Sequence, residues 1–281
     1  MSILTDLMTR RPNAPFEVDL KPEQVEEFRT RGFIQIPRIA SDEELAWLVQ
    51  VYDALFAEKR GSYHGGYFDL TRPYDSEGED LLPQIIAPEI RFPQLKETGF
   101  WTNGRKLARQ LLGAEPAEPV RGWGHMIRKP ARIGEKLPWH QDEAYWEPEF
   151  DYRALGCWMP LDDATLESGC MSMIPGSHLG DIVPHRHIDD DPSVQGLETI
   201  AMPARAAEAV PLPTLAGGAV LHHCRMLHMS GPNVSDNVRR AYANEWQTSP
   251  VRRAVPYVRP WQVEAEEAHA RRFGKDRVWF D

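Results

Sequence analysis

The sequence predicts a mainly β domain flanked by helices, and three observations support this class. Between residues 119 and 250, short apolar or alternating runs are separated by Pro, Gly, Asp and Asn, which is typical of a β-sandwich or barrel. Pro accounts for 24 of the 281 residues, above the usual share of about 5%, which fits frequent turns between short strands. The helical patterns lie before and after this region.

The N-terminal part predicts helices and one strand. Residues 21–32 form a short helix, because a proline suits its first turn and a glycine its end. Residues 33–37 follow as a strand. Ser41 and Glu44 form a capping box before apolar residues at helical spacing, which predicts a helix over 42–58.

After residue 60 the sequence predicts a loop, then a helix, and then a series of strands. Residues 61–80 are rich in Gly, Asp and aromatics without either period, which indicates a long loop of the kind that often serves as a lid. A helix over 102–112 follows. The predicted strands then lie at 120–128, 136–146, 154–161, 170–175, 208–212, 218–228 and 238–247. A charged, Ala-rich stretch at 262–272 is expected to be a surface helix.

No repeat and no shift of composition marks a second domain. At this length one β-rich domain can bury its own core. We therefore expect a single domain over 1–281. It comprises an N-terminal helical part over about 1–118, a β core over about 119–250 and a C-terminal extension over 251–281.

Composition narrows the class of partner. With 42 acidic against 32 basic residues and no basic block, the net charge of −10 argues against nucleic acid or an anionic membrane. The three cysteines, Cys157, Cys170 and Cys224, carry no CxxC spacing and fit a reducing cytosol. Neither a signal peptide nor a membrane span is expected. We expect a cytoplasmic monomer or homodimer that acts on a small molecule.

Two histidines are followed two residues later by an acid. In a strand, residues i and i+2 share a face, so His140 and Asp142 can present an imidazole and a carboxylate to one ion. The alternative is a surface histidine beside a solvated acid. His187 and Asp189 lie in an acidic run between prolines, which is most simply a solvated loop.

A third ligand would decide between these interpretations. The apolar run at 218–228 offers His222, His223 and His228. His222 and His228 share a parity that His223 opposes, so all three cannot face one site. Two histidines and one carboxylate form the facial triad of non-haem Fe(II) oxygenases, whereas a third histidine or a cysteine set would point to zinc.

The residues resemble the phytanoyl-CoA dioxygenase family of Fe(II)- and 2-oxoglutarate-dependent oxygenases. The likeness covers most of the chain, from a helix, Gly-Phe strand and second helix near the start. His-Gln-Asp at 140–142 matches the iron-binding motif, and residues 162–178 match the "lDd…e.G…iPGSH" signature. His228-Met-Ser-Gly-Pro-Asn, with an Arg eleven residues after the His, matches the distal motif.

The resemblance implies a double-stranded β-helix (jelly-roll, cupin-like) core with N-terminal helices. The resemblance selects His228 over His222 as the third metal ligand, and Arg239 over Arg240 as the carboxylate-binding arginine. Arg240 is then expected to be a solvated strand residue. The implied Fe(II) ligands are His140, Asp142 and His228. The residues implied for the 2-oxoglutarate site are Arg239, which pairs with the far carboxylate, together with Ser230, Trp158 and Gln141.

The implied reaction consumes O2 and 2-oxoglutarate, releases succinate and CO2, and hydroxylates an unactivated C–H bond of a small metabolite. Asp142 argues against halogenation, because halogenating relatives have a small residue there. Desaturation, cyclisation and epoxidation by the same iron chemistry are alternatives. A cupin-like metalloenzyme that does not use 2-oxoglutarate is another, and Arg239 argues against it. A non-catalytic binding barrel is a third, and the intact ligand set argues against that.

The substrate is less well defined. His222 stands where the family commonly has an aromatic residue, and Gly217-Gly218 stands where it usually has Gly-Asp; His222 is expected to line the pocket. The loops 61–80 and 180–200 would cover the mouth. Candidate mouth residues are Tyr63, His64, Tyr67, Phe68, Tyr145, Trp146 and His187. With few basic residues there, a small uncharged or amphipathic metabolite is favoured over an acyl-CoA thioester.

Overall fold

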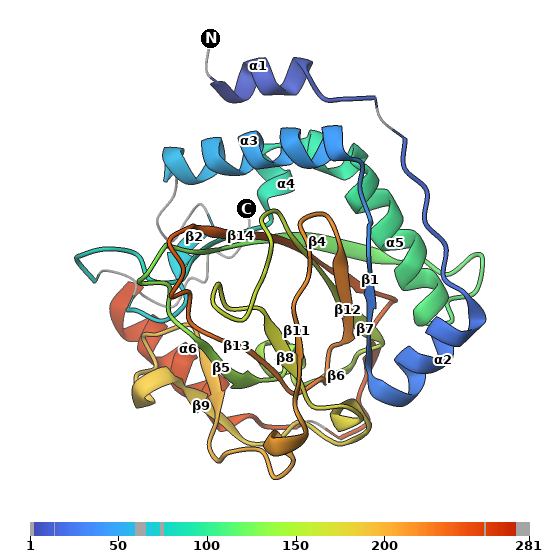
Figure 1. Cartoon of the computed structure of the whole chain (residues 1–281). Helices are drawn as coiled ribbons and strands as arrows, with labels where there is room; N and C mark the ends of the chain where they lie inside the picture. Colours follow the sequence, from blue (N-terminus) through green and yellow to red (C-terminus); the bar gives the residue numbers. More distant parts are fainter. Residues whose placement is uncertain (1–2, 14, 60–65, 74–75, 256, 274–281) are drawn as a thin grey trace.

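The computed structural model describes residues 3–273 apart from residues 14, 60–65, 74–75 and 256. In this part the chain is mainly β-sheet with helices (Figure 1). The helices are α1 Ile3–Thr9, α2 Pro22–Arg31, α3 Asp42–Glu58, α4 Pro88–Arg91, α5 Gly99–Leu111 and α6 Pro260–Phe273. No helix among the described residues has the length and apolar character needed to cross a membrane.

Two sheets carry the architecture. The larger has the strand order β1-β12-β7-β14-β4-β3-β2, and the smaller has the order β11-β8-β13-β5. The large-sheet strands are β1 Phe33–Ile36, β2 Tyr67–Asp69, β3 Pro83–Ile86, β4 Arg121–Lys129, β7 Ala154–Pro160, β12 Ala219–His223 and β14 Arg239–Gln247. The small-sheet strands are β5 Leu137–His140, β8 Met171–Met173, β11 Val210–Leu212 and β13 His228–Ser230. Two short ribbons pair β9 His185–His187 with β10 Leu197–Thr199, and β6 Phe150–Asp151 with β15 Val251–Arg252.

The N-terminal helices cover the outer face of the large sheet. In Figure 1, α3 runs above β14 and β4, with β5, β8 and β13 on the opposite side of the centre. The main apolar cluster joins α3 and α5 to this sheet, and Tyr242 and Trp246 of β14 belong to it. Because side chains alternate across a strand, Ala243 and Glu245 face the other way, into the interior.

The predicted capping box is only half formed, because the Glu44 side chain binds elsewhere. Ser41 does cap α3, accepting a hydrogen bond of 3.1 Å from the Glu44 amide. The Glu44 carboxylate, however, accepts the amides of Gly99 and Phe100, at 2.6 and 2.8 Å. It therefore stabilises the N-terminus of α5, which begins three residues before the predicted boundary.

The predicted strand over 218–228 is wrong in one respect that matters for function. The chain leaves the large sheet after His223, turns, and enters the small sheet at His228. The parity that relates His222 to His228 in a continuous strand therefore does not apply. The two rings approach from different sheets, with centroids 4.7 Å apart.

Three smaller differences concern the other runs. The run 136–146 is β5 followed by a 3₁₀ turn over Asp142–Tyr145. The described part of 61–80 contains β2, so it is not all loop. Part of 180–200 forms the ribbon of β9 and β10.

Candidate metal centre and co-substrate pocket

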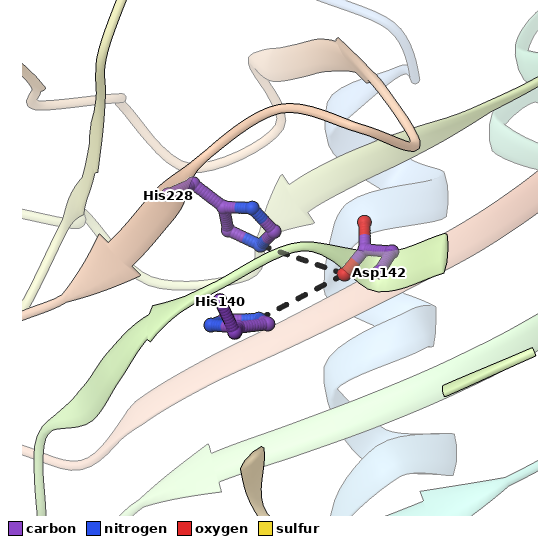
Figure 2. A group of neighbouring side chains, drawn as sticks. All are labelled: His140, Asp142 and His228. Atoms are coloured by element: carbon purple, nitrogen blue, oxygen red, sulfur yellow. Dashed lines mark ion pairs between the residues drawn. The ribbon is translucent and has the colours of Figure 1, made fainter. Parts of the chain in front are cut away.

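Two histidines from neighbouring strands and an aspartate from the 3₁₀ turn after β5 meet inside the protein (Figure 2). His140 ends β5 and His228 begins β13, and the two are direct cross-strand partners. Asp142 Oδ1 lies 3.8 Å from His140 Nε2 and 3.6 Å from His228 Nε2. One ligand atom from each residue lies within 4.8 Å of the others, so the three side chains that the sequence singles out do converge.

Hydrogen bonds fix the orientation of both imidazoles. His140 Nδ1 lies 2.8 Å from the Pro138 carbonyl, and His228 Nδ1 lies 2.9 Å from the Met226 carbonyl. A carbonyl only accepts, so each Nδ1 carries the hydrogen and each Nε2 keeps its lone pair. Burial, with the adjacent His228, lowers the pKa of His140 to about 3. Burial lowers the pKa of His228 as well, so both rings are neutral at pH 7.

A fourth side chain holds the carboxylate. His222 Nε2 donates to Asp142 Oδ2 at 2.9 Å, which leaves Oδ1 directed at the two histidines. Burial raises the pKa of Asp142, but His228 and the His222 hydrogen bond outweigh burial and keep this pKa below its usual value. Two neutral imidazoles and one anionic carboxylate on one side of a site suit non-haem Fe(II).

A buried guanidinium with unpaired donors lines the same pocket. Arg239, the first residue of β14, is 2% exposed, and its Nε and Nη1 have no hydrogen-bond partner among the described residues. Burial lowers the pKa of Arg239 to about 10, so it is still a cation at neutral pH. Because unpaired buried donors are costly, the geometry fits a planar acceptor such as a carboxylate.

Ser230 and Trp158 belong to the same part of the pocket. Both are buried and line it together with Arg239, whose guanidinium carbon lies 5.5 Å from the centre of the Trp158 ring. The cavity holds about 790 Å³ and is lined from both sheets. The metal triad and three of the four residues predicted for the co-substrate therefore share one cavity.

Gln141, the fourth of these residues, lies elsewhere. Its buried amide donates to the carbonyls of Arg225 and Asp181, at 2.8 and 3.3 Å, and accepts from the Val183 amide at 2.9 Å. It does not line the cavity. The expectation that Gln141 contacts the co-substrate is not supported, because all these hydrogen bonds tie loops together.

Arg240 is not the solvated residue that was expected. Its guanidinium pairs with Asp53 of α3 at 2.8 Å and with Asp162 at 2.9 Å. It points away from Arg239, since consecutive strand residues face opposite sides. Arg240 therefore fastens α3 to β14.

Only some of the predicted mouth residues line the cavity. Phe68, Tyr145, Trp146 and His187 line the cavity, whereas Tyr67 does not. Tyr63 and His64 lie outside the described residues. His187 is buried, with its ring nitrogens 2.7 and 2.8 Å from the carbonyls of Val194 and Trp261, so the solvated-loop interpretation is wrong for this residue.

The C-terminal helix is a functional element that sequence reasoning missed. One side of α6 contributes Trp261, Gln262, Ala265 and Glu266 to the cavity wall, so it is more than a surface helix. The preceding Arg259 donates to the carbonyls of Glu143 and Trp146. The charged stretch at 262–272 carried no signal of this packing, because its partners lie more than a hundred residues earlier.

Glu143, directly after the metal-site aspartate, holds this C-terminal segment. Its side chain is 0% exposed and pairs with Arg225 at 2.7 Å, Arg253 at 3.4 Å and Arg259 at 3.7 Å. One buried carboxylate therefore joins the metal centre's own loop to the turn after β12 and to the chain that enters α6.

Comparison with known proteins agrees with this geometry. The model of the family "Phytanoyl-CoA dioxygenase (PhyH)" matches residues 28–241. EvdO2 from Micromonospora carbonacea var. aurantiaca, solved in complex with 2-oxoglutarate, is 39% identical with a TM-score of 0.75. That likeness covers 88% of this chain and 99% of EvdO2. SnoK, a non-haem alpha-ketoglutarate-dependent carbocyclase from nogalamycin biosynthesis, is 25% identical with a TM-score of 0.60, over 84% of this chain and 87% of SnoK.

The curated relatives match over different lengths. Ectoine dioxygenase of Halomonas elongata is 29% identical over 239 residues, which is 78% of this chain and 68% of that protein. Bovine phytanoyl-CoA dioxygenase domain-containing protein 1 is 38% identical over 120 residues, which is 42% of this chain but only 41% of the bovine protein. With the family model matched over most of its length, the chain belongs to the phytanoyl-CoA dioxygenase family.

Proposed function

We propose that this dioxygenase uses Fe(II), 2-oxoglutarate and O2 to hydroxylate an unactivated C–H bond of a small-molecule metabolite, releasing succinate and CO2. One observation carries the proposal. The His140, Asp142 and His228 cluster opens into the same cavity as the unpaired donors of Arg239. A metal site and a carboxylate site in one enclosed space are what an oxygenase with a 2-oxo acid co-substrate requires.

We assign the residues as follows. His140, Asp142 and His228 would hold the iron, with Nε2, Oδ1 and Nε2 as donors. Arg239 would bind the far carboxylate of 2-oxoglutarate, with the Ser230 hydroxyl beside it and the Trp158 ring as a wall. When bound, the iron supplies activation of O2, decarboxylation of the 2-oxo acid and removal of hydrogen from a substrate carbon. The apolar wall limits the access of water to this chemistry.

We also infer that the seven- and four-stranded sheets form a double-stranded β-helix, and that the whole chain works as one domain. The strand order and the shared cavity support this inference. A small-molecule substrate, a cytoplasmic location and a monomeric or dimeric state are parts of the same proposal.

Cyclisation is the second candidate reaction. It is favoured over desaturation and epoxidation because SnoK is described as a carbocyclase and is 25% identical over 84% of this chain. A metalloenzyme without 2-oxoglutarate is disfavoured, since it would leave the buried donors of Arg239 unpaired.

The proposed function predicts a spectroscopic signal. Anaerobic addition of Fe(II) and 2-oxoglutarate is expected to give the weak visible charge-transfer band of a ferrous 2-oxo acid chelate, and admission of air is expected to give succinate. A metal chelator should abolish both, and oxaloacetate in place of 2-oxoglutarate is the matched co-substrate control. The proposal fails if neither band nor succinate appears.

His222 predicts a second effect on the metal centre. Replacing it with phenylalanine is expected to weaken Fe(II) binding about 10- to 100-fold, the usual cost of losing a group that orients a metal ligand. His222→Gln keeps an N–H donor for Asp142 Oδ2 and should retain most of the affinity. Anaerobic metal titration compares the three proteins, and equal affinities in all of them would contradict this role.

A further inference from the structure

Part of the cavity wall carries buried polar atoms that lack partners within the described chain. They are Glu245 Oε2 and Gln247 Oε1 on β14, and His222 Nδ1 on β12. All three residues line the cavity. An unpaired buried polar atom costs about 1–3 kcal/mol. We therefore interpret this wall as one that a bound molecule completes with hydrogen bonds.

These atoms lie away from Arg239, the residue assigned to the co-substrate. On β14 the cavity-lining residues are Arg239, Ala243, Glu245 and Gln247, as the alternation of a strand dictates. Glu245 is six residues beyond Arg239, roughly 20 Å along the strand at about 3.4 Å per residue. A five-carbon dicarboxylate anchored on Arg239 does not span that distance. Glu245 and Gln247 are thus left for the substrate.

Gly156 lies between two of the unpaired groups and leaves room for the His222 ring. In the large sheet it is the cross-strand partner of both His222 and Glu245. A Cβ at Gly156 would lie 2.6 Å from His222 Cε1 and 3.3 Å from Glu245 Oε1. A side chain at this position would collide with the imidazole, so the glycine is what allows His222 to lie beside Glu245.

The polarity of this wall specifies which groups a bound molecule must supply. In the neutral tautomer that gives its Nε2 hydrogen to Asp142, His222 has Nδ1 as an acceptor, and Gln247 Oε1 is also an acceptor. The three groups lie on two strands separated by β7, so a single donor cannot reach them all. Burial and the Asp142 charge raise the pKa of Glu245, in agreement with a neutral group at this wall.

An apolar surface accompanies the acceptors. Trp123 is the direct cross-strand partner of Glu245 and faces the same cavity. Its ring meets that of Trp146 edge to face, with centroids 5.9 Å apart. Apart from Asp142 and Arg239, which the metal and the co-substrate would engage, and Glu245, whose neutral form burial favours, the charged lining residues are Glu147 and Glu266 against Arg91, which disfavours an anionic substrate.

We propose that this wall binds a neutral polyhydroxylated substrate, an inference that rests on the proposed function. Its hydroxyl groups donate to His222 Nδ1, Glu245 and Gln247, and its carbon skeleton packs on Trp123. Several spaced hydroxyl groups supply the several donors that the wall requires, and each can also accept from a neutral carboxyl group.

The test uses the Fe(II)- and 2-oxoglutarate-loaded enzyme and its Glu245→Gln and Glu245→Leu variants. Anaerobic formation of the charge-transfer band is recorded first for each protein, and failure of the wild type at this step counts against the proposed function. The probes are methyl glycosides and inositols, each compared with its amino and its carboxylate derivative. Binding is followed by the shift of the band, and turnover by succinate release.

Neutral hydroxylated probes are expected to shift the band and increase succinate release. Glu245→Leu should weaken their binding about tenfold or more, and Glu245→Gln, which keeps a neutral donor and acceptor, by no more than about threefold. The inference is overturned if the amino probes bind best and lose affinity in Glu245→Gln. It is likewise overturned by preference for carboxylates, by unchanged binding in Glu245→Leu, or by a normal band with no response to any hydroxylated probe.

Discussion

Replacing Arg239 with alanine is expected to weaken 2-oxoglutarate binding about 100- to 10,000-fold and to leave Fe(II) affinity nearly unchanged. The guanidinium is buried with two free donor nitrogens, and a hydrogen bond between charged groups contributes about 1.5–3 kcal/mol. Two such bonds account for the expected loss, at about 1.4 kcal/mol for each factor of ten. Anaerobic titration of the charge-transfer band gives the co-substrate affinity, and a separate metal titration gives that of Fe(II).

The neighbouring residue supplies a matched control. Arg240 is paired with Asp53 and Asp162 on the other face of the strand, so Arg240→Ala should reduce stability without changing 2-oxoglutarate affinity. Arg239→Lys keeps the charge but not the planar fork, and should fall between wild type and Arg239→Ala. Loss of Fe(II) binding in Arg239→Ala, with 2-oxoglutarate affinity preserved, would show that its role is misassigned.

Removing the Glu143 carboxylate is expected to lower the free energy of unfolding by about 3–5 kcal/mol, because Glu143→Ala leaves the buried Arg259 without a counter-ion, whereas Arg225 and Arg253 keep Asp151. Arg259 is 0% exposed at its side chain and has no other acidic partner among the described contacts. Urea unfolding measures the change. Limited proteolysis should show that the segment after residue 250 is cleaved more readily in the variant.

Glu149 provides the comparison for Glu143. It pairs with Arg252 at 2.7 Å, but both side chains are largely exposed, at 51% and 73%. Glu149→Ala should therefore cost less than about 1 kcal/mol. If the two variants lose similar stability, the buried network does not anchor the C-terminal segment.

Local signals in the sequence made the members of the metal triad candidates, and the family resemblance selected His228 over His222. His140 and Asp142 are two residues apart, and His228 precedes a Ser-Gly-Pro-Asn turn. The position of His222 could not be deduced in the same way. An apolar run does not reveal where the chain passes from one sheet to another, and the passage between His223 and His228 makes the parity argument invalid.

Partners distant in sequence explain the other differences. Arg240 binds acids 78 and 187 residues away, and the carbonyl and amide partners of Gln141 lie some 40 and 84 residues away. Nothing in the local pattern of either residue distinguishes a buried structural role from a solvent-exposed or ligand-binding one. The predicted strands over 120–128, 154–161 and 238–247 agree closely with β4, β7 and β14. Long alternating or apolar runs indicate which faces of a strand are buried, so the sequence alone is enough to predict them.

Some of the residues that line the cavity lie after the part of the chain that matches the family model. The family match ends at residue 241, whereas Glu245, Gln247 and the α6 residues Trp261 and Gln262 come after it. The wall proposed for the substrate therefore spans both parts of the chain, since His222 and Trp123 lie inside the matched range and Glu245 and Gln247 lie after it. Exchanging the segment from residue 245 onward between relatives, with Glu143 unchanged and Arg253 and Arg259 restored in the incoming segment, would alter this part of the wall and leave the metal ligands untouched.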